Sequence, residues 1–77
     1  MAVGYVLITT RPAKEMMVYD ELRKCREVCE VHPLFGEYDI IAKIDTNNTN
    51  GVGSIVSDKI RLIEGIKDTK TLLGIAF

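Results

Sequence analysis

Several features that this sequence lacks exclude whole classes of protein. It has no run of the ~18 apolar residues that a membrane-spanning helix needs, so we expect no membrane segment. Its 10 basic and 11 acidic residues are interleaved, without the basic cluster that direct binding to nucleic acid requires. Two cysteines are too few for a secreted disulfide scaffold, and the basic start and cleavage site of a signal peptide are missing. These absences predict an intracellular, cytoplasmic protein.

The residues that usually carry catalysis or bind metals are also scarce. His32 is the single histidine and stands on the polar parity of an expected strand, where a surface or interface role is typical. Cys25, Cys29 and His32 do not match the spacing of zinc ligands, so we expect both cysteines to be small core residues. The segment 50–53 (NGVG) lacks the lysine of a phosphate-binding loop. We therefore expect no enzymatic activity, no metal and no cofactor.

The length of the chain allows a single domain, 1–77. A domain this small buries only roughly 60% of the surface that its unfolded form exposes, so a monomer would be marginally stable. Small scaffolds usually recover the missing stability through disulfides, a metal or oligomerisation. Oligomerisation is the route that this composition favours.

The first predicted strand, residues 3–10, is apolar on both faces. It is rich in β-branched residues and has no helical period, which is typical of a strand. Because side chains alternate along a strand, Tyr5 and Leu7 fall on one face. Val6 and Ile8 fall on the other. A strand of this kind is covered on both sides.

The rest of the chain shows two helical patterns and three further strand patterns. Apolar residues recur at helical spacing in the two helical patterns, and they alternate or cluster in the three strand patterns. Pro12 suits the first turn of a helix, so the first helix is predicted to start near Arg11. In chain order the expected elements are a strand 3–10, a helix 13–25, a strand 28–35, a tight connection 36–37, a strand 38–45, a polar loop 46–50, a helix from 52 to a cap at Gly65, and a strand 69–77.

This order predicts an α+β, ferredoxin-like βαββαβ domain with a four-stranded antiparallel sheet. Two helices cover only one face of such a sheet, and the first and last strands remain apolar on the other face. A large exposed apolar face is typical of an interface. We therefore expect the sheet of a second subunit to cover it, as in dimeric α/β barrels.

Four residues of the hairpin and the last strand are candidates for contact with a ligand. Asp39 is predicted to point away from the apolar face of its strand, where its carboxylate can meet an ammonium group. Gly36 has no Cβ, so its backbone can approach a ligand closely. Thr69 and Thr71 share one face of the last strand and offer hydroxyls that donate and accept hydrogen bonds. Ordinary roles as strand formers and as an edge charge explain the same residues.

Several segments together form a recognisable pattern. They are Pro12, the helix with Val18 and Leu22, 28–31 (VCEV), 36–41 (GEYDII) and 64–71 (EGIKDTKT). This pattern resembles the effector domain of the Lrp/AsnC transcription regulators, also called the RAM domain, over nearly the whole chain. Its most specific parts are the G-x-Y-D motif and the G-[IV]-x-x-T-x-T motif.

The resemblance implies homodimers whose sheets pack together, and octamer-like or decamer-like rings of such dimers. It implies that small ligands, usually amino acids, bind where dimers meet. The ligand-binding residues carried over by resemblance are Gly36, Tyr38, Asp39, Thr69 and Thr71. Asp39 is then expected to meet the amino group of the ligand. The backbone near Gly36 and the two threonine hydroxyls would hold the remaining polar groups.

One departure from the family pattern changes the expected function. Full-length regulators place a helix-turn-helix domain ahead of this one, whereas this chain starts at the first strand. We therefore expect a stand-alone RAM protein that senses an amino acid and modulates full-length relatives by co-assembly. Two alternatives stay open. One is a small enzyme of the dimeric α/β-barrel type, which needs a polar pocket between helices and sheet, and the other is a ligand-free hetero-oligomerisation partner.

Overall fold

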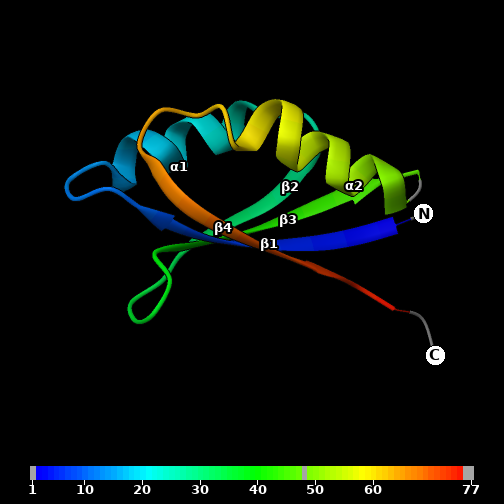
Figure 1. Cartoon of the computed structure of the whole chain (residues 1–77), viewed down its shortest axis with the longest axis horizontal. Helices are drawn as coiled ribbons and strands as arrows, with labels where there is room; N and C mark the ends of the chain where they lie inside the picture. Colours follow the sequence, from blue (N-terminus) through cyan, green and yellow to red (C-terminus); the bar gives the residue numbers. More distant parts are fainter. Residues whose placement is uncertain (1, 48, 76–77) are drawn as a thin grey trace.

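The structure is a computed structural model that describes residues 2–47 and 49–75. Its elements follow the order β1 (Ala2–Thr10), α1 (Glu15–Lys24), β2 (Val28–Pro33), β3 (Ile40–Thr46), α2 (Thr49–Ile55), the π-helical turn η1 (Val56–Ile60) and β4 (Ile66–Leu73). The four strands form one antiparallel sheet in the order β2-β3-β1-β4. Both helices lie on the same side of this sheet (Figure 1). The predicted ferredoxin-like fold is confirmed.

The hydrophobic core lies between the helices and one face of the sheet. Val6 and Ile8 of β1 point into it from the sheet and Val18 and Leu22 of α1 from the helices, all with no exposed surface. Burying side chains of this size contributes about 1.5–3 kcal/mol each. The full set of buried apolar residues is Ala2, Val6, Ile8, Val18, Leu22, Ile40, Ala42, Ile44, Val52, Val56 and Ile60.

Both helices differ from the predicted ones at their ends. The first begins at Glu15, because the chain turns at 11–14, where the Lys14 N–H donates to Arg11 O at 3.1 Å and Ala13 takes a positive φ of 67°. The second helix, α2, passes into η1, whose buried residues Val56 and Ile60 belong to the core. The helical segment ends at Ile60. Gly65 therefore does not cap the helix. Its φ of 102° instead turns the chain into β4.

The strand boundaries also move. A six-residue loop, 34–39, replaces the predicted tight connection at 36–37. The register of β2 shifts between Val28 and Glu30, so Val28 and Val31 both face the helices. The last strand starts earlier than predicted and ends at Leu73, and residues 76 and 77 of the predicted strand lie outside the described residues. The helices among residues 2–47 and 49–75 are all too short or too polar to span a membrane.

Candidate functional site

The face of the sheet turned away from the helices, here called the open face, has an apolar centre. Side chains at the odd positions of β1, including Tyr5 and Leu7, point to it because the even positions are buried against the helices. Directly paired strand residues share a face. Ile41 of β3 pairs with Leu7, and Leu72 of β4 pairs with Tyr5, so both extend the same apolar surface.

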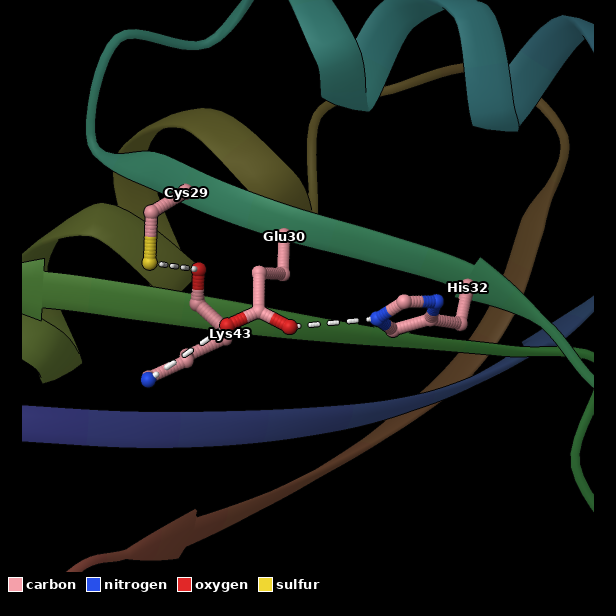
Figure 2. A network of polar contacts seen from close by, with 4 residues as sticks. All are labelled: Cys29, Glu30, His32 and Lys43. Atoms are coloured by element: carbon pink, nitrogen blue, oxygen red, sulfur yellow. Dashed lines mark hydrogen bonds and ion pairs between the residues drawn. The ribbon is translucent and has the colours of Figure 1, made fainter.

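Charged side chains border this apolar centre. On the β2 side, Figure 2 shows the Glu30 carboxylate between His32 and Lys43. Glu30 accepts from His32 Nε2 at 3.2 Å and from Lys43 Nζ at 3.5 Å. These two partners, His32 first, hold the pKa of the Glu30 carboxyl below its ordinary value. The Tyr5 phenol and then Glu30 raise the pKa of the Lys43 ammonium. On the β4 side, Lys70 pairs with Leu7.

An apolar centre inside a polar rim is the usual anatomy of a protein–protein interface. The sequence correctly predicted a first strand with two apolar faces. It was wrong about the last strand, because the open face of β4 carries Asp68 and Lys70 beside Leu72. The apolar centre therefore lies on β1, with Ile41 added from β3 and Leu72 from β4, while Lys43 of β3 stands on the same face opposite Tyr5.

The predicted ligand residue Asp39 lies at the end of β1 and is held there by Thr10. Asp39 Oδ2 accepts from the Thr10 backbone N–H at 2.8 Å and from Thr10 Oγ1 at 3.2 Å. The Asp39 N–H donates to Ile8 O at 2.9 Å, and Asp39 O accepts from the Leu34 N–H at 2.8 Å. The prediction that Asp39 sits within a strand was wrong, since β3 starts at Ile40. Its carboxylate joins the hairpin loop to β1.

The two threonines of the T-x-T motif lie on the other side of β1. Thr69 pairs with Ile8 and Thr71 pairs with Val6, while Asp39 contacts β1 from the β3 side. Two spacings between strands, roughly 10 Å in total, separate the two sides. Thr69 is half-buried and Thr71 is exposed. Within one chain the candidate ligand residues therefore flank β1 instead of surrounding one point.

Gly36 and Tyr38 lie in the loop 34–39, next to Asp39 in sequence. Gly36 is exposed and has a φ of 153°, a conformation that favours glycine. A Cβ built on Gly36 would meet no atom within 4 Å, so the glycine serves the turn and not a close approach within the chain. Tyr38 is half-buried. The structure brings these two residues and Asp39 to one end of the sheet.

The sequence did not identify Thr10 as a site residue. It occupies the buried parity of β1 and is only 6% exposed. A buried hydroxyl needs a hydrogen-bond partner, so its parity was an available signal. Thr10 is the buried polar residue that the structure shows within 2–47 and 49–75, where the rest of the core is apolar.

The cysteines are placed differently from the prediction of two core residues. Cys29 is exposed on β2, where its Sγ lies 3.4 Å from Lys43 O (Figure 2), and Cys25 is only half-buried. Burial nevertheless raises the pKa of the Cys25 thiol. In the described part of the chain, no three His, Cys, Asp or Glu side chains gather as metal ligands would.

Comparison with known proteins gives a family and a fold. The sequence profile of the Lrp/AsnC ligand binding domain matches residues 3–75. An uncharacterized HTH-type transcriptional regulator of Pyrococcus abyssi is 37% identical over 74 residues, covering 92% of this chain and 49% of the relative. The crystal structure of FFRP-DM1 superposes with a TM-score of 0.92 at 32% identity, covering 97% of this chain and 100% of that one. A Neisseria meningitidis regulator, crystallised as an L-Met complex, has a TM-score of 0.84 at 21% identity, over 97% of this chain and 50% of that one.

These matches differ in how far they extend. The chain spans about half the length of the curated relatives it matches. The profile match, in contrast, runs from the second residue of β1 to beyond the end of β4. It includes every strand and helix described above. The chain belongs to the Lrp/AsnC ligand-binding domain family, whose domain is also called the RAM domain.

Proposed function

We propose that this chain is an oligomeric module that binds an amino-acid effector and acts with transcription regulators of its own family. The observation that carries the proposal is the open face, with its apolar centre and charged rim. Tyr5 and Leu72 are 36% and 45% exposed there, although large apolar side chains are usually buried in a small domain. A second copy of the same sheet would cover them and form a homodimer.

The proposed ligand site combines the G-x-Y-D loop with the T-x-T strand. Asp39 Oδ2 accepts both hydrogen bonds from Thr10, and within the described residues no hydrogen bond to Asp39 Oδ1 is seen. That oxygen is suited to an ammonium group, and the hydroxyls of Thr69 and Thr71 are suited to a carboxylate. Because these groups flank β1 in one chain, we propose that a second copy completes the site, where dimers meet in a ring.

The ligand class and the partners come from the relatives. The L-methionine complex of the Neisseria meningitidis regulator supports an amino acid as the effector. Relatives named as HTH-type transcriptional regulators support a regulatory role without catalysis. We propose that the chain exerts this role by co-assembly with such regulators. A regulatory module of this kind would act in the cytoplasm, and would form an octamer-like or decamer-like ring.

A thermal-unfolding screen with the twenty amino acids at millimolar concentration tests the ligand. An effector present at 100 times its Kd stabilises the folded state by about 2.7 kcal/mol. In a domain of this size that raises Tm by roughly 10–20 °C. Thr71→Val removes one exposed hydroxyl without changing the shape of the side chain, so it should reduce the shift. Thr9→Val is the matched control, because Thr9 lies on the opposite face of the sheet.

Two results would contradict the proposed ligand site. The first is a screen in which no amino acid moves Tm by more than about 1 °C. A shift that small means that the amino acid is present at a concentration below its Kd. The second is an effector whose shift is the same in the Thr71→Val variant, the Thr9→Val variant and the unmodified chain. That outcome would keep the amino acid but move its site away from the T-x-T strand.

A further inference from the structure

A second apolar site lies on the helix side of the molecule, away from the open face. A cavity of about 170 Å³ opens between the start of α1, the end of β2 and the start of β3. Its lining is apolar and consists of Met16, Tyr19, Pro33 and Ile40, with Glu15 at the side. We call it the α1–β2 pocket.

The size of the α1–β2 pocket matches one chemical group. An engineered protein cavity of about 150 Å³ with apolar walls stays free of water and binds benzene. A pocket of about 170 Å³ with apolar walls therefore suits a phenyl ring. The nearby Tyr19 ring adds the edge-to-face or offset contact that aromatic pairs prefer.

The chain also carries a phenyl ring that is exposed to solvent. Phe35 lies in the loop 34–39 and is fully exposed, at 106% of its reference area. The loop extends from the sheet on the side away from the helices (Figure 1). Phe35 is not among the residues that line the α1–β2 pocket of its own chain. A Phe side chain left in water is less favourable than a buried one, so the exposed ring favours a contact that covers it.

We propose that the phenyl ring of Phe35 inserts into the α1–β2 pocket of a second copy of this chain. Phe35 does not line the pocket of its own chain, so each copy offers one free phenyl ring and one pocket, and the contact can link copies into a closed ring. It also places the loop 34–39, which carries Gly36, Tyr38 and Asp39, against a neighbouring molecule. This inference rests on the proposed function, in which a second copy completes the ligand site.

The area of the contact decides its place in the assembly. A buried Phe side chain removes roughly 150–250 Å² from water. A stable specific interface needs about 1,000 Å² or more. The Phe35 contact is therefore too small to hold two free monomers together, and it joins dimers that the open face has already formed.

Sedimentation velocity of three variants tests the inference. The unmodified chain is expected to form species larger than a dimer. Phe35→Ala removes the ring, and Met16→Lys puts a charge at the mouth of the pocket, where Met16 is 72% exposed and its loss leaves the core intact. Both should sediment as dimers, because losing a buried Phe weakens a contact by about tenfold to a hundredfold. Leu62→Ala, which removes another exposed apolar side chain that does not line the α1–β2 pocket, should keep the larger species.

Mixing the two variants separates a specific contact from a general loss of apolar surface. Phe35→Ala chains keep the pocket and Met16→Lys chains keep the ring, so an equimolar mixture should again form species larger than a dimer. A mixture that stays dimeric would overturn the proposed pairing. A Phe35→Ala variant that sediments with the mass of the unmodified chain would also overturn it. If the Tm of that variant falls while its mass stays the same, Phe35 fills the pocket of its own chain instead. An unmodified chain that is monomeric would instead refute the association through the open face.

Discussion

The contact between Thr10 and Asp39 makes a direct prediction about stability. Asp39→Ala removes the carboxylate that accepts both the Thr10 N–H, at 2.8 Å, and the Thr10 hydroxyl, at 3.2 Å. The change leaves these two donors without their partner at a position that is only 6% exposed. The loop 34–39 then loses one of its attachments to β1.

The size of the effect follows from the kind of hydrogen bond. A hydrogen bond to a charged acceptor contributes about 1.5–3 kcal/mol, and the longer hydroxyl bond adds little because the two share one oxygen. We therefore expect Asp39→Ala to lower the free energy of unfolding by about 2 kcal/mol. In a domain of this length, that corresponds to a fall in Tm of roughly 8–16 °C. Asp39→Asn keeps an acceptor oxygen but not the charge, so its effect should be about half as large.

Urea unfolding at one fixed protein concentration measures the difference, since association makes stability depend on concentration. The matched control is Asp68→Ala. The Asp68 carboxylate accepts from the Thr69 N–H at a similar 2.9 Å, but on the exposed surface of β4, where water can replace it. The control should stay within about 0.5 kcal/mol of the unmodified chain. An Asp39→Ala variant that is equally stable would refute a structural role for the carboxylate.

Two further predictions concern close packing and an ion pair. Gly4→Ala should lower the free energy of unfolding by about 1–3 kcal/mol, because its new Cβ would lie 2.5 Å from Val52 Cγ1. A Cβ at Gly53 would meet no atom within 4 Å, so Gly53→Ala should instead raise the free energy of unfolding, by up to about 1 kcal/mol, through its higher helix propensity. Urea unfolding of the two variants measures both changes. The Lys59 ammonium, at 2.9 and 3.0 Å from the two oxygens of Glu27, holds the pKa of that carboxyl below its ordinary 4.5, so the pair stabilises the fold above that pH and the benefit is lost as the pH falls through the lowered pKa. Lys59→Met should return the Glu27 pKa toward 4.5 in an NMR titration of the carboxyl carbon, and an unchanged Glu27 titration would contradict the assignment.

The parts of the fold that depend on local pattern were predictable. The two apolar parities of residues 3–10 correctly indicated a strand buried on one side and apolar on the other. The helix with Val18 and Leu22 followed from helical spacing, and both residues are fully buried. Its start was predicted too early, because Pro12 is compatible with a turn as well as with the first turn of a helix. Ala13 takes a positive φ in that turn. An alanine does not indicate such a conformation, so the sequence could not predict it.

The parts of the candidate site that depend on distant contacts were not predictable. Thr10 and Asp39 are 29 positions apart, so neither residue type nor spacing shows that they meet. The α1–β2 pocket likewise arises where three elements meet. The motif residues Gly36 and Tyr38 were correctly expected near Asp39, because they are neighbours in sequence. That Thr69 and Thr71 face them across β1 depends on the strand order of the whole sheet.

The most direct test of the central claim is the mass of the chain in solution with and without an intact open face. We predict that sedimentation velocity gives at least twice the 8.6 kDa of one chain. Leu7→Lys, which puts a charge at the centre of the open face, should reduce the mass toward one chain, and Leu62→Lys, which puts the same charge on an exposed position elsewhere, should not. A folded, unmodified chain that sediments as a single 8.6 kDa molecule would contradict the account.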